Sequence, residues 1–250
     1  MSVPKDRTKW PCRVRVELPS AGRGMYAVNC KRSDDEVHMM ITIYPFAPPV
    51  EEKALFAAHD RMVGEIRRKY GCAGYSGGGI GVSREEYFYY PVILGANRAV
   101  NWLAKQPFAD RKRFTYTGGS QGGGLGLGLC ALNPIFSKVV LHVPAYCDAY
   151  SYTGRRSGAF TLVNRMGRGE QEKAKARLSY FDGAYFARRI KCPTRVSVAF
   201  LDRDCPPATV YAAYNNLAAE DVRISHMIGF PHGIRADVLQ QLEKWRKDLR

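Results

Sequence analysis

The sequence predicts an α/β fold, in which a mostly parallel β-sheet is covered by helices. Apolar, β-branched runs alternate along the chain with segments of helical periodicity. Several of these runs are nearly continuous, as in strands buried on both faces, and no internal repeat or heptad pattern interrupts the alternation. Because 250 residues usually form one core, we expect a single domain over residues 1–250.

Apolar runs bounded by turn-forming residues define the expected strands. They are Arg13–Leu18, Val37–Tyr44, Phe114–Thr117, Lys138–Val143, Arg195–Leu201 and Val222–Ile228. Segments with apolar residues three or four positions apart define the expected helices. They are Glu51–Lys69, Glu85–Lys105, Gly122–Leu132, Ala208–Leu217 and Ala236–Leu249. Ligands of such folds bind beyond the carboxyl ends of the strands, so we expect the chemistry there.

One segment, residues 148–190, breaks this alternation. It has a stretch rich in Gly, Ser and Arg, followed by a helix-like stretch at Glu170–Leu178. We expect a cap or lid insertion over the site, although a plain surface excursion would give the same pattern.

Composition restricts the class of protein. With 46% hydrophobic and 24% charged residues, the chain is typical of a globular protein. The net charge is +15, but its basic clusters are short, scattered and without interleaved aromatic residues, so we expect a solvated basic surface and no nucleic-acid partner. No stretch approaches the roughly 20 apolar residues of a membrane span, and the N-terminus lacks a signal-peptide pattern, so we expect a cytoplasmic protein without a membrane partner.

The seven cysteines are spread singly, and none forms a C-x-x-C pair. An odd number without paired spacing argues against a disulfide framework and against a zinc site. Small buried thiols in a reducing compartment are expected.

The strongest chemical signal is the motif G-x-S-x-G at Gly118–Gly122, with Ser120 at its centre. It lies between a predicted strand and a predicted helix, which is the context of a nucleophile elbow. The elbow holds its serine in a strained conformation, and side chains two residues to either side would collide with the neighbouring strand and helix. The helix N-terminus beside the serine favours a developing oxyanion.

Other glycine-rich turns fit less well. The turn Thr117–Gly124 matches the phosphate-binding turn of short-chain dehydrogenases, but it follows at least two strands, and no Tyr-x-x-x-Lys occurs after it. A Walker loop would require Gly-Lys-Ser/Thr, which is missing. The run Gly77–Gly81 has no clear strand before it and is expected to be a flexible loop.

A serine on a nucleophile elbow needs a general base and an acid that orients the base. Both are expected later in the chain, because folds with this elbow place them in the order Ser, then Asp or Glu, then His. His232 lies in a loop at the carboxyl end of a predicted strand and is preferred as the base. His226 lies within that strand, where a partly buried structural role is favoured. Asp202 follows the preceding strand directly and is preferred as the acid. Asp204 is the alternative acid, and its other role would be to cap the following helix.

In this arrangement Asp202 orients His232, which takes the proton from Ser120 as the serine attacks an ester carbonyl. We expect the oxyanion hole to use the backbone N–H of Gln121 and a second N–H from the loop 18–22, with Ala21 as the candidate donor. Aromatic residues near Tyr44, Tyr146 and the cap are expected to line the pocket.

Several stretches together resemble the acetyl xylan esterase and cephalosporin C deacetylase family of α/β-hydrolases. They are Glu85–Tyr90, Ala96–Trp102, Gly118–Leu125, Val143–Asp148, Tyr180–Pro193 and Asp202–Asn215. The resemblance covers about residues 83 to 234. Its pattern places the nucleophile on Ser120, the acid on Asp202 and the base on His232, in agreement with the choice made from chain order and strand ends.

The resemblance implies the α/β-hydrolase fold and a serine esterase that removes acetyl groups from sugars or short xylo-oligosaccharides. It implies no metal or organic cofactor, a small acetylated carbohydrate as the substrate, and a homo-oligomer. The sequence departs from the family pattern at Pro231, where the family usually has Gly, and in the loosely matched loop 18–22. The family's N-terminal strands are expected to be missing or shortened.

Two other functions are compatible with the same residues. One is a hydrolase that uses this triad on other short-chain esters, lactones or thioesters. The other is a non-catalytic protein of the same fold that binds an acidic polysaccharide or a protein partner through its basic surface.

Overall fold

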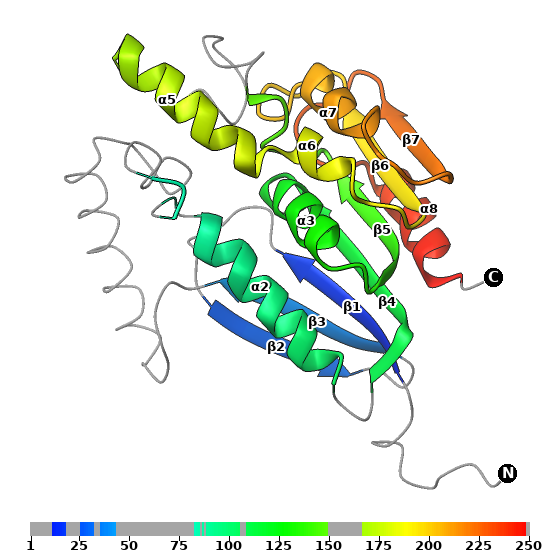
Figure 1. The fold of residues 1–250 in the computed structure, drawn as a ribbon. Coiled ribbons are helices and arrows are strands. Elements are labelled where there is room, and N and C mark those ends of the chain that lie inside the picture. The colour runs from blue at the N-terminus through cyan, green and yellow to red at the C-terminus, as the bar shows by residue number, and fades with distance from the viewer. Residues whose placement is uncertain are drawn as a thin grey trace, which may run out of the picture.

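The structure is a computed structural model. It describes the backbone of residues 12–18, 26–32 and 36–43, and beyond them residues 83–85, 87, 89–105, 109–149 and 167–248. Seven strands form one sheet in the order β2-β3-β1-β4-β5-β6-β7 (Figure 1). β2 and β3 pair in antiparallel fashion and every other pair is parallel. The predicted α/β class with a mostly parallel sheet is therefore confirmed.

The strands are β1 (Cys12–Leu18), β2 (Tyr26–Arg32), β3 (Glu36–Ile43), β4 (Ala109–Gly119), β5 (Phe136–His142), β6 (Thr194–Ala199) and β7 (Val222–Met227). All six predicted strands are present. β2 was not predicted, because it reads Tyr-Ala-Val-Asn-Cys-Lys-Arg, with one β-branched residue and a polar C-terminal half. It lies at the edge of the sheet, where a strand is paired on one side only and needs less apolar surface than a central strand.

The helices are α2 (Tyr89–Leu103), α3 (Gln121–Leu132), α5 (Arg168–Leu178), α6 (Gly183–Ala187), α7 (Pro207–Tyr214) and α8 (Ala236–Lys247), with a short 3-10 turn, η4 (Ser179–Phe181). The predicted helix Glu51–Lys69 lies outside the described residues. α2 begins four residues later than predicted. Pro91 explains the difference, because it has no N–H with which to continue a helix from Tyr87.

α3 is the central helix of the molecule. Figure 1 shows α2, α3 and α6 in front of the sheet and α8 behind it. Ten of the twelve residues of α3 are buried, so its sequence, Gln-Gly-Gly-Gly-Leu-Gly-Leu-Gly-Leu-Cys-Ala-Leu, has no polar face. The glycines allow α3 to pack closely against the sheet, because a Cβ at Gly126 would overlap the ring of Tyr116 on β4. The helix that follows Ser120 is thus fixed firmly to the sheet.

The predicted cap, residues 148–190, is described only in part. Its second half consists of α5, η4 and α6. α5 buries only Ala174 and Leu178 and extends away from the sheet (Figure 1), whereas α6 packs against α3. None of the helices in the described ranges has the length and apolar character needed to cross a membrane.

Candidate active site

Ser120 occupies a sharp turn between β4 and α3. Its backbone angles are φ 51° and ψ −119°, a conformation that costs a non-glycine residue on the order of 1–3 kcal/mol. Three hydrogen bonds hold it there: the Ser120 N–H donates to the carbonyl of His142 at 2.8 Å, and the Ser120 carbonyl accepts from the N–H groups of Gly124 at 3.1 Å and Ala145 at 2.9 Å. The strained serine is therefore fixed from both α3 and the end of β5, as a nucleophile elbow requires.

Gly118 shows why the motif needs glycine before the serine. A Cβ at this position would lie 2.6 Å from the hydroxyl oxygen of Tyr116 and 2.8 Å from the carbonyl oxygen of Gly122. These two atoms already form a buried hydrogen bond of 2.6 Å, in which the Tyr116 hydroxyl donates. A side chain at residue 118 would therefore disrupt the link between β4 and the first turn of α3.

Asp202 and His232 form a hydrogen-bonded pair at the neighbouring strand ends. The Nδ1 atom of His232 lies 2.8 Å from Oδ2 of Asp202, while Oδ1 accepts from the backbone N–H groups of Asp204 at 2.9 Å and Cys205 at 2.8 Å. The Asp202 side chain is fully buried, and the His232 side chain is 32% exposed. The buried carboxylate thus holds one ring nitrogen and leaves the ring open to solvent on another side.

The alternative acid and base do not enter this pair. Asp204 is exposed, and only its backbone N–H contacts Asp202. It does not cap the next helix either, since the N-cap of α7 is Pro206. His226 was expected to be partly buried, which is wrong: its ring is exposed and lies 2.7 Å from the Tyr211 hydroxyl. The reason is that β7 is an edge strand.

Cys205 lies between the serine and the Asp–His pair. Its Sγ atom is 4.0 Å from Oγ of Ser120, and Sγ, a ring nitrogen of His232 and a carboxylate oxygen of Asp202 all lie within 4.8 Å of one another. Among the described residues, the hydrogen-bond partner of Ser120 Oγ is this thiol and not His232. A hydrogen bond between Ser120 Oγ and His232 would therefore require a side-chain rotation.

Burial makes the thiol of Cys205 a poor nucleophile. Burial, and next the negative charge of Asp202, raise the pKa of this thiol well above its usual range. A thiol attacks as the thiolate, so the protonated form is unreactive.

Gln121 occupies the first position of α3, where a backbone N–H has no acceptor within the helix. Its side chain donates to the hydroxyl of Tyr89, and that hydroxyl is 2.6 Å from the hydroxyl of Tyr146. These contacts fix the residue whose N–H was predicted to face the oxyanion. The other predicted donor, Ala21, lies outside the described residues, as does Tyr44.

Asp182, which was not predicted from the sequence, organises the loop after β5. Its buried carboxylate accepts the backbone N–H groups of Asp148 at 2.8 Å, Ala149 at 2.7 Å and Ala184 at 2.9 Å. The same loop contains Tyr146 with a φ of 56° and Asp148 with a φ of 60°. Burial raises the pKa of Asp182, although the three N–H donors oppose this shift. Only its place before a short helix could have marked it in the sequence.

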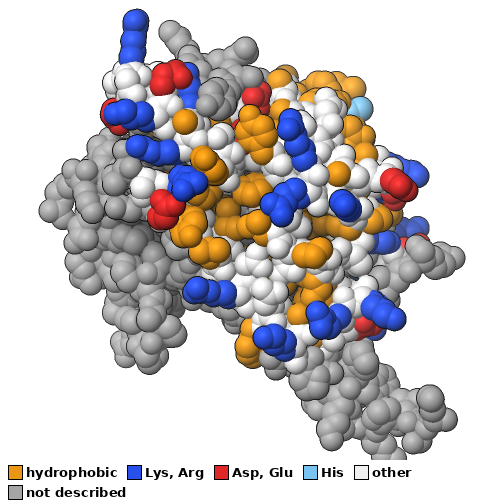
Figure 2. All heavy atoms as spheres, viewed as in Figure 1, with side chains coloured by type: hydrophobic (Ala, Val, Ile, Leu, Met, Phe, Trp, Pro, Cys, Tyr) orange, Lys and Arg blue, Asp and Glu red, His pale blue; other side chains and the backbone are white. Residues whose placement is uncertain are grey.

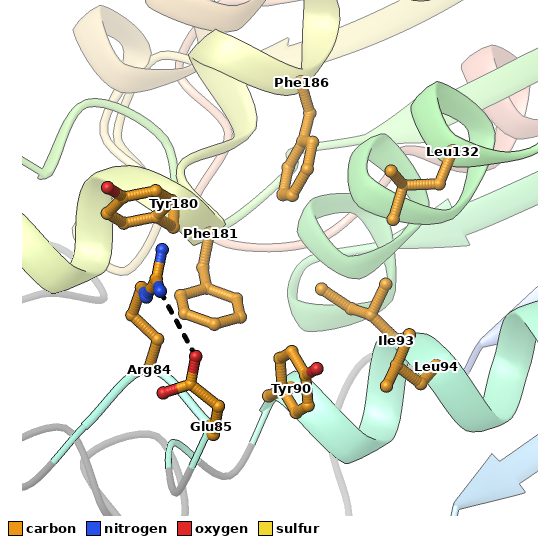
Figure 3. Close-up of a pocket in the computed structure, with 9 residues that line it drawn as sticks. All are labelled: Arg84, Glu85, Tyr90, Ile93, Leu94, Leu132, Tyr180, Phe181 and Phe186. Carbon is orange, nitrogen blue, oxygen red and sulfur yellow. Dashed lines mark ion pairs between the residues drawn. The ribbon is translucent and has the colours of Figure 1, made fainter.

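A separate hollow of about 370 Å³ lies beside the C-terminal end of α3, far along the helix from Ser120. Figure 2 shows hydrophobic side chains gathered on this face, with Lys and Arg around them. Figure 3 shows the aromatic rings of Tyr90, Tyr180, Phe181 and Phe186 around the hollow. At its rim Arg84 pairs with Glu85 at 3.3 Å. None of the described residues that line the hollow is a serine, a cysteine or a histidine.

The site has the arrangement of the α/β-hydrolase class. A strained serine lies between a strand and a buried glycine-rich helix, and an Asp–His pair lies beyond the ends of β6 and β7. Comparisons with known proteins agree. The family model described as Acetyl xylan esterase (AXE1) matches residues 58–249. The chain therefore belongs to the acetyl xylan esterase family, whose members are carboxylic ester hydrolases.

One curated relative is the acetyl esterase Axe7A of Xylanibacter ruminicola, which is 33% identical over 136 residues. That match covers 54% of this chain and 31% of the relative, so the chain spans about a third of the relative's length.

Among solved structures, an acetyl xylan esterase from Paenibacillus sp. R4 matches with a TM-score of 0.76 and 22% identity, covering 98% of this chain and 76% of that one. Acetyl xylan esterase 1 from Thermoanaerobacterium sp. JW/SL YS485 matches with a TM-score of 0.72 and 19% identity, covering 97% and 76%. At these identities the structural matches support the fold.

Proposed function

We propose that the protein is a serine esterase that removes acetyl groups from sugars or xylo-oligosaccharides through Ser120, His232 and Asp202. The observation that carries the proposal is the 2.8 Å contact between a fully buried Asp202 and His232, on the loops beside Cys205, whose sulfur is 4.0 Å from Oγ of the strained Ser120. A carboxylate held in this way fixes the imidazole tautomer that can accept the serine proton. Membership of the acetyl xylan esterase family supports the acetyl group as the part removed.

In the first half of the reaction, His232 accepts the Ser120 proton as Oγ attacks the acetyl carbonyl carbon. The carbonyl oxygen becomes an oxyanion, which the N–H of Gln121 and the positive end of the α3 dipole stabilise. When the tetrahedral intermediate collapses, the bond to the sugar oxygen breaks and His232 gives its proton to that oxygen. The products are the sugar alcohol and an acetyl-Ser120 ester.

In the second half, water attacks the acetyl-Ser120 ester while His232 accepts a proton from the water. Collapse of the second intermediate returns that proton to Ser120 Oγ and releases acetate. Asp202 stays ionised throughout and stabilises the imidazolium form of His232 at both steps. We propose that the described part of the segment 148–190 borders the substrate site as a cap.

Hydrolysis of p-nitrophenyl acetate and acetylated xylo-oligosaccharides tests this proposal. The wild type should release nitrophenol and acetate, and Ser120→Ala should lower kcat by about 10⁴-fold or more. Ser137→Ala is a matched control, because this serine lies at the start of β5, at the opposite end of the strand from His142, and its hydroxyl donates to the carbonyl of Phe114. No turnover by the folded wild type would contradict the proposal and favour a binding protein. Turnover of nitrophenyl acetate alone would favour a different short-chain ester.

A further inference from the structure

The pair Asp202–His232 and the thiol of Cys205 form a cluster of three side chains of the types that bind metal ions. One ligand-type atom from each residue lies within 4.8 Å of the other two. Ser120 Oγ lies 4.0 Å from the Cys205 sulfur. This cluster could not be predicted from the sequence, because His232 lies 27 residues after Cys205 and no cysteine or histidine near Cys205 completes a metal-binding spacing.

We propose that this cluster binds a thiophilic divalent cation such as Zn²⁺, with Asp202, Cys205 and His232 as ligands and Ser120 Oγ or water in the fourth position. The combination of one sulfur, one imidazole nitrogen and one carboxylate oxygen is typical of zinc ligands, and three protein ligands with one open position are common. The consequence for catalysis, which is inhibition, rests on the proposed function. Binding of the cation does not.

The geometry requires only small movements. Bonds of about 2.0–2.3 Å to a tetrahedral ion place its ligands roughly 3.3–3.7 Å apart, compared with the upper limit of 4.8 Å in this structure. Asp202 and Cys205 are held by backbone contacts at the start of one loop. His232 is on an exposed loop after Gly229, whose φ is 71°, so its ring is the ligand best able to move.

The charges favour a cation. Asp202 is a fully buried carboxylate. Coordination of the cation by Cys205 would displace the proton of its buried thiol, and that proton would be released to solvent. The two resulting negative charges balance the divalent ion. A bound cation is the largest charge in such a site and reverses the cost of ionising its ligands. Within the described ranges, the ion-pair partner of Asp202 is His232 and not a lysine or an arginine.

Cation binding would block the esterase reaction directly. Coordination would take the ring of His232 out of its hydrogen bond with Asp202, and the Ser120 oxygen would lie against the ion. We therefore expect reversible inhibition by low concentrations of Zn²⁺ and full recovery with a chelator. The site would connect the esterase activity to the availability of thiophilic metal ions.

The test measures binding separately from hydrolysis. The purified full chain is titrated with Co²⁺, whose bond to a thiolate gives a near-ultraviolet charge-transfer band, and with Zn²⁺ by calorimetry. The wild type should show the band and one tight site. Cys205→Ser and His232→Ala should each weaken binding at least about tenfold, and Cys205→Ser should abolish the band. Cys205→Ala serves if the serine variant does not fold by circular dichroism.

Matched variants exist for both ligands. Cys192→Ser changes another thiol, and His226→Ala changes an exposed histidine on β7. Both should bind the cations as the wild type does. Ser120→Ala should retain the band, because the sulfur, nitrogen and carboxylate ligands remain.

The inference is overturned if the wild type gives no band, or if Cys205→Ser and His232→Ala bind as tightly as the wild type. Hydrolysis by the metal-free enzyme without cation binding would overturn this inference and leave the proposed function intact. Cation binding by a folded protein that has no esterase activity would contradict the proposed function and leave this inference intact.

Discussion

Replacing Asp202 by Asn should lower kcat by about 10⁴-fold, which corresponds to roughly 5.5 kcal/mol of activation free energy. The structure gives the reason. Two backbone N–H groups, at 2.9 and 2.8 Å, require an acceptor at the Oδ1 position, so the amide oxygen of the asparagine would take that place. Its NH₂ group would then face Nδ1 of His232. The ring would have to carry its proton on Nε2, where it could no longer accept one from Ser120.

The assay compares the turnover of p-nitrophenyl acetate by the wild type and the variant, with circular dichroism to show that the variant is folded. Asp204→Asn is the matched control, because that carboxylate is exposed and lies two residues away. Turnover by this control should stay within a few-fold of the wild type. A loss of less than tenfold in Asp202→Asn, or an equal loss in Asp204→Asn, would refute the assignment of the acid.

Two further predictions concern stability. Gly118→Ala should lower the free energy of unfolding, measured in urea titrations, by about 1–3 kcal/mol, because its Cβ would lie 2.6 Å from the Tyr116 hydroxyl. The control Gly169→Ala, whose Cβ would meet nothing within 4 Å, should lose no stability. Burial raises the pKa of Asp182. The folded state therefore binds the Asp182 proton more tightly than the unfolded state does. The stability that this proton adds is present at low pH and is lost as the pH rises through the folded pKa. The free energy of unfolding of the wild type relative to Asp182→Asn should therefore increase between about pH 7 and pH 4, and a constant difference across that range would contradict the assignment.

Much of the fold could be predicted because its signals are local. The central strands are continuous apolar runs, and a sheet buried on both faces requires such runs. The edge strand β2 was missed because strand pairing on one side leaves the sequence free to carry Asn, Lys and Arg. The predicted start of α2 is four residues too early, because Pro91 has no N–H with which to continue the helix from Tyr87.

The sequence signals for the candidate site are local: glycines surround Ser120, and Asp202 and His232 lie in the loops that follow β6 and β7. The structure brings Asp202 and His232 together. Asp182 and Tyr89 could not be predicted in the same way. Asp182 acts through backbone N–H groups 33 and 34 residues away, and Tyr89 meets Gln121 across 32 residues. Contacts of that kind depend on how α2, α6 and the loop after β5 pack around α3.

The exposure of His226 also depends on the complete sheet. The sequence shows that this histidine lies within a strand, but only the strand order shows that β7 is at the edge. The same order places Asp202 and His232 on adjacent strand ends, because β6 and β7 are neighbours. Chain order left both histidines as candidate bases, and only the loop position of His232 beyond the strand favoured it. The environment expected for His226 was wrong.

Covalent labelling with a fluorophosphonate, followed by peptide mapping, tests the central claim most directly. Such a reagent reacts with a serine only when a neighbouring base activates its hydroxyl. We predict stoichiometric phosphonylation of Ser120, and a strong loss of labelling in folded His232→Ala. A label on another residue, or an unlabelled but folded wild-type protein, would contradict the account.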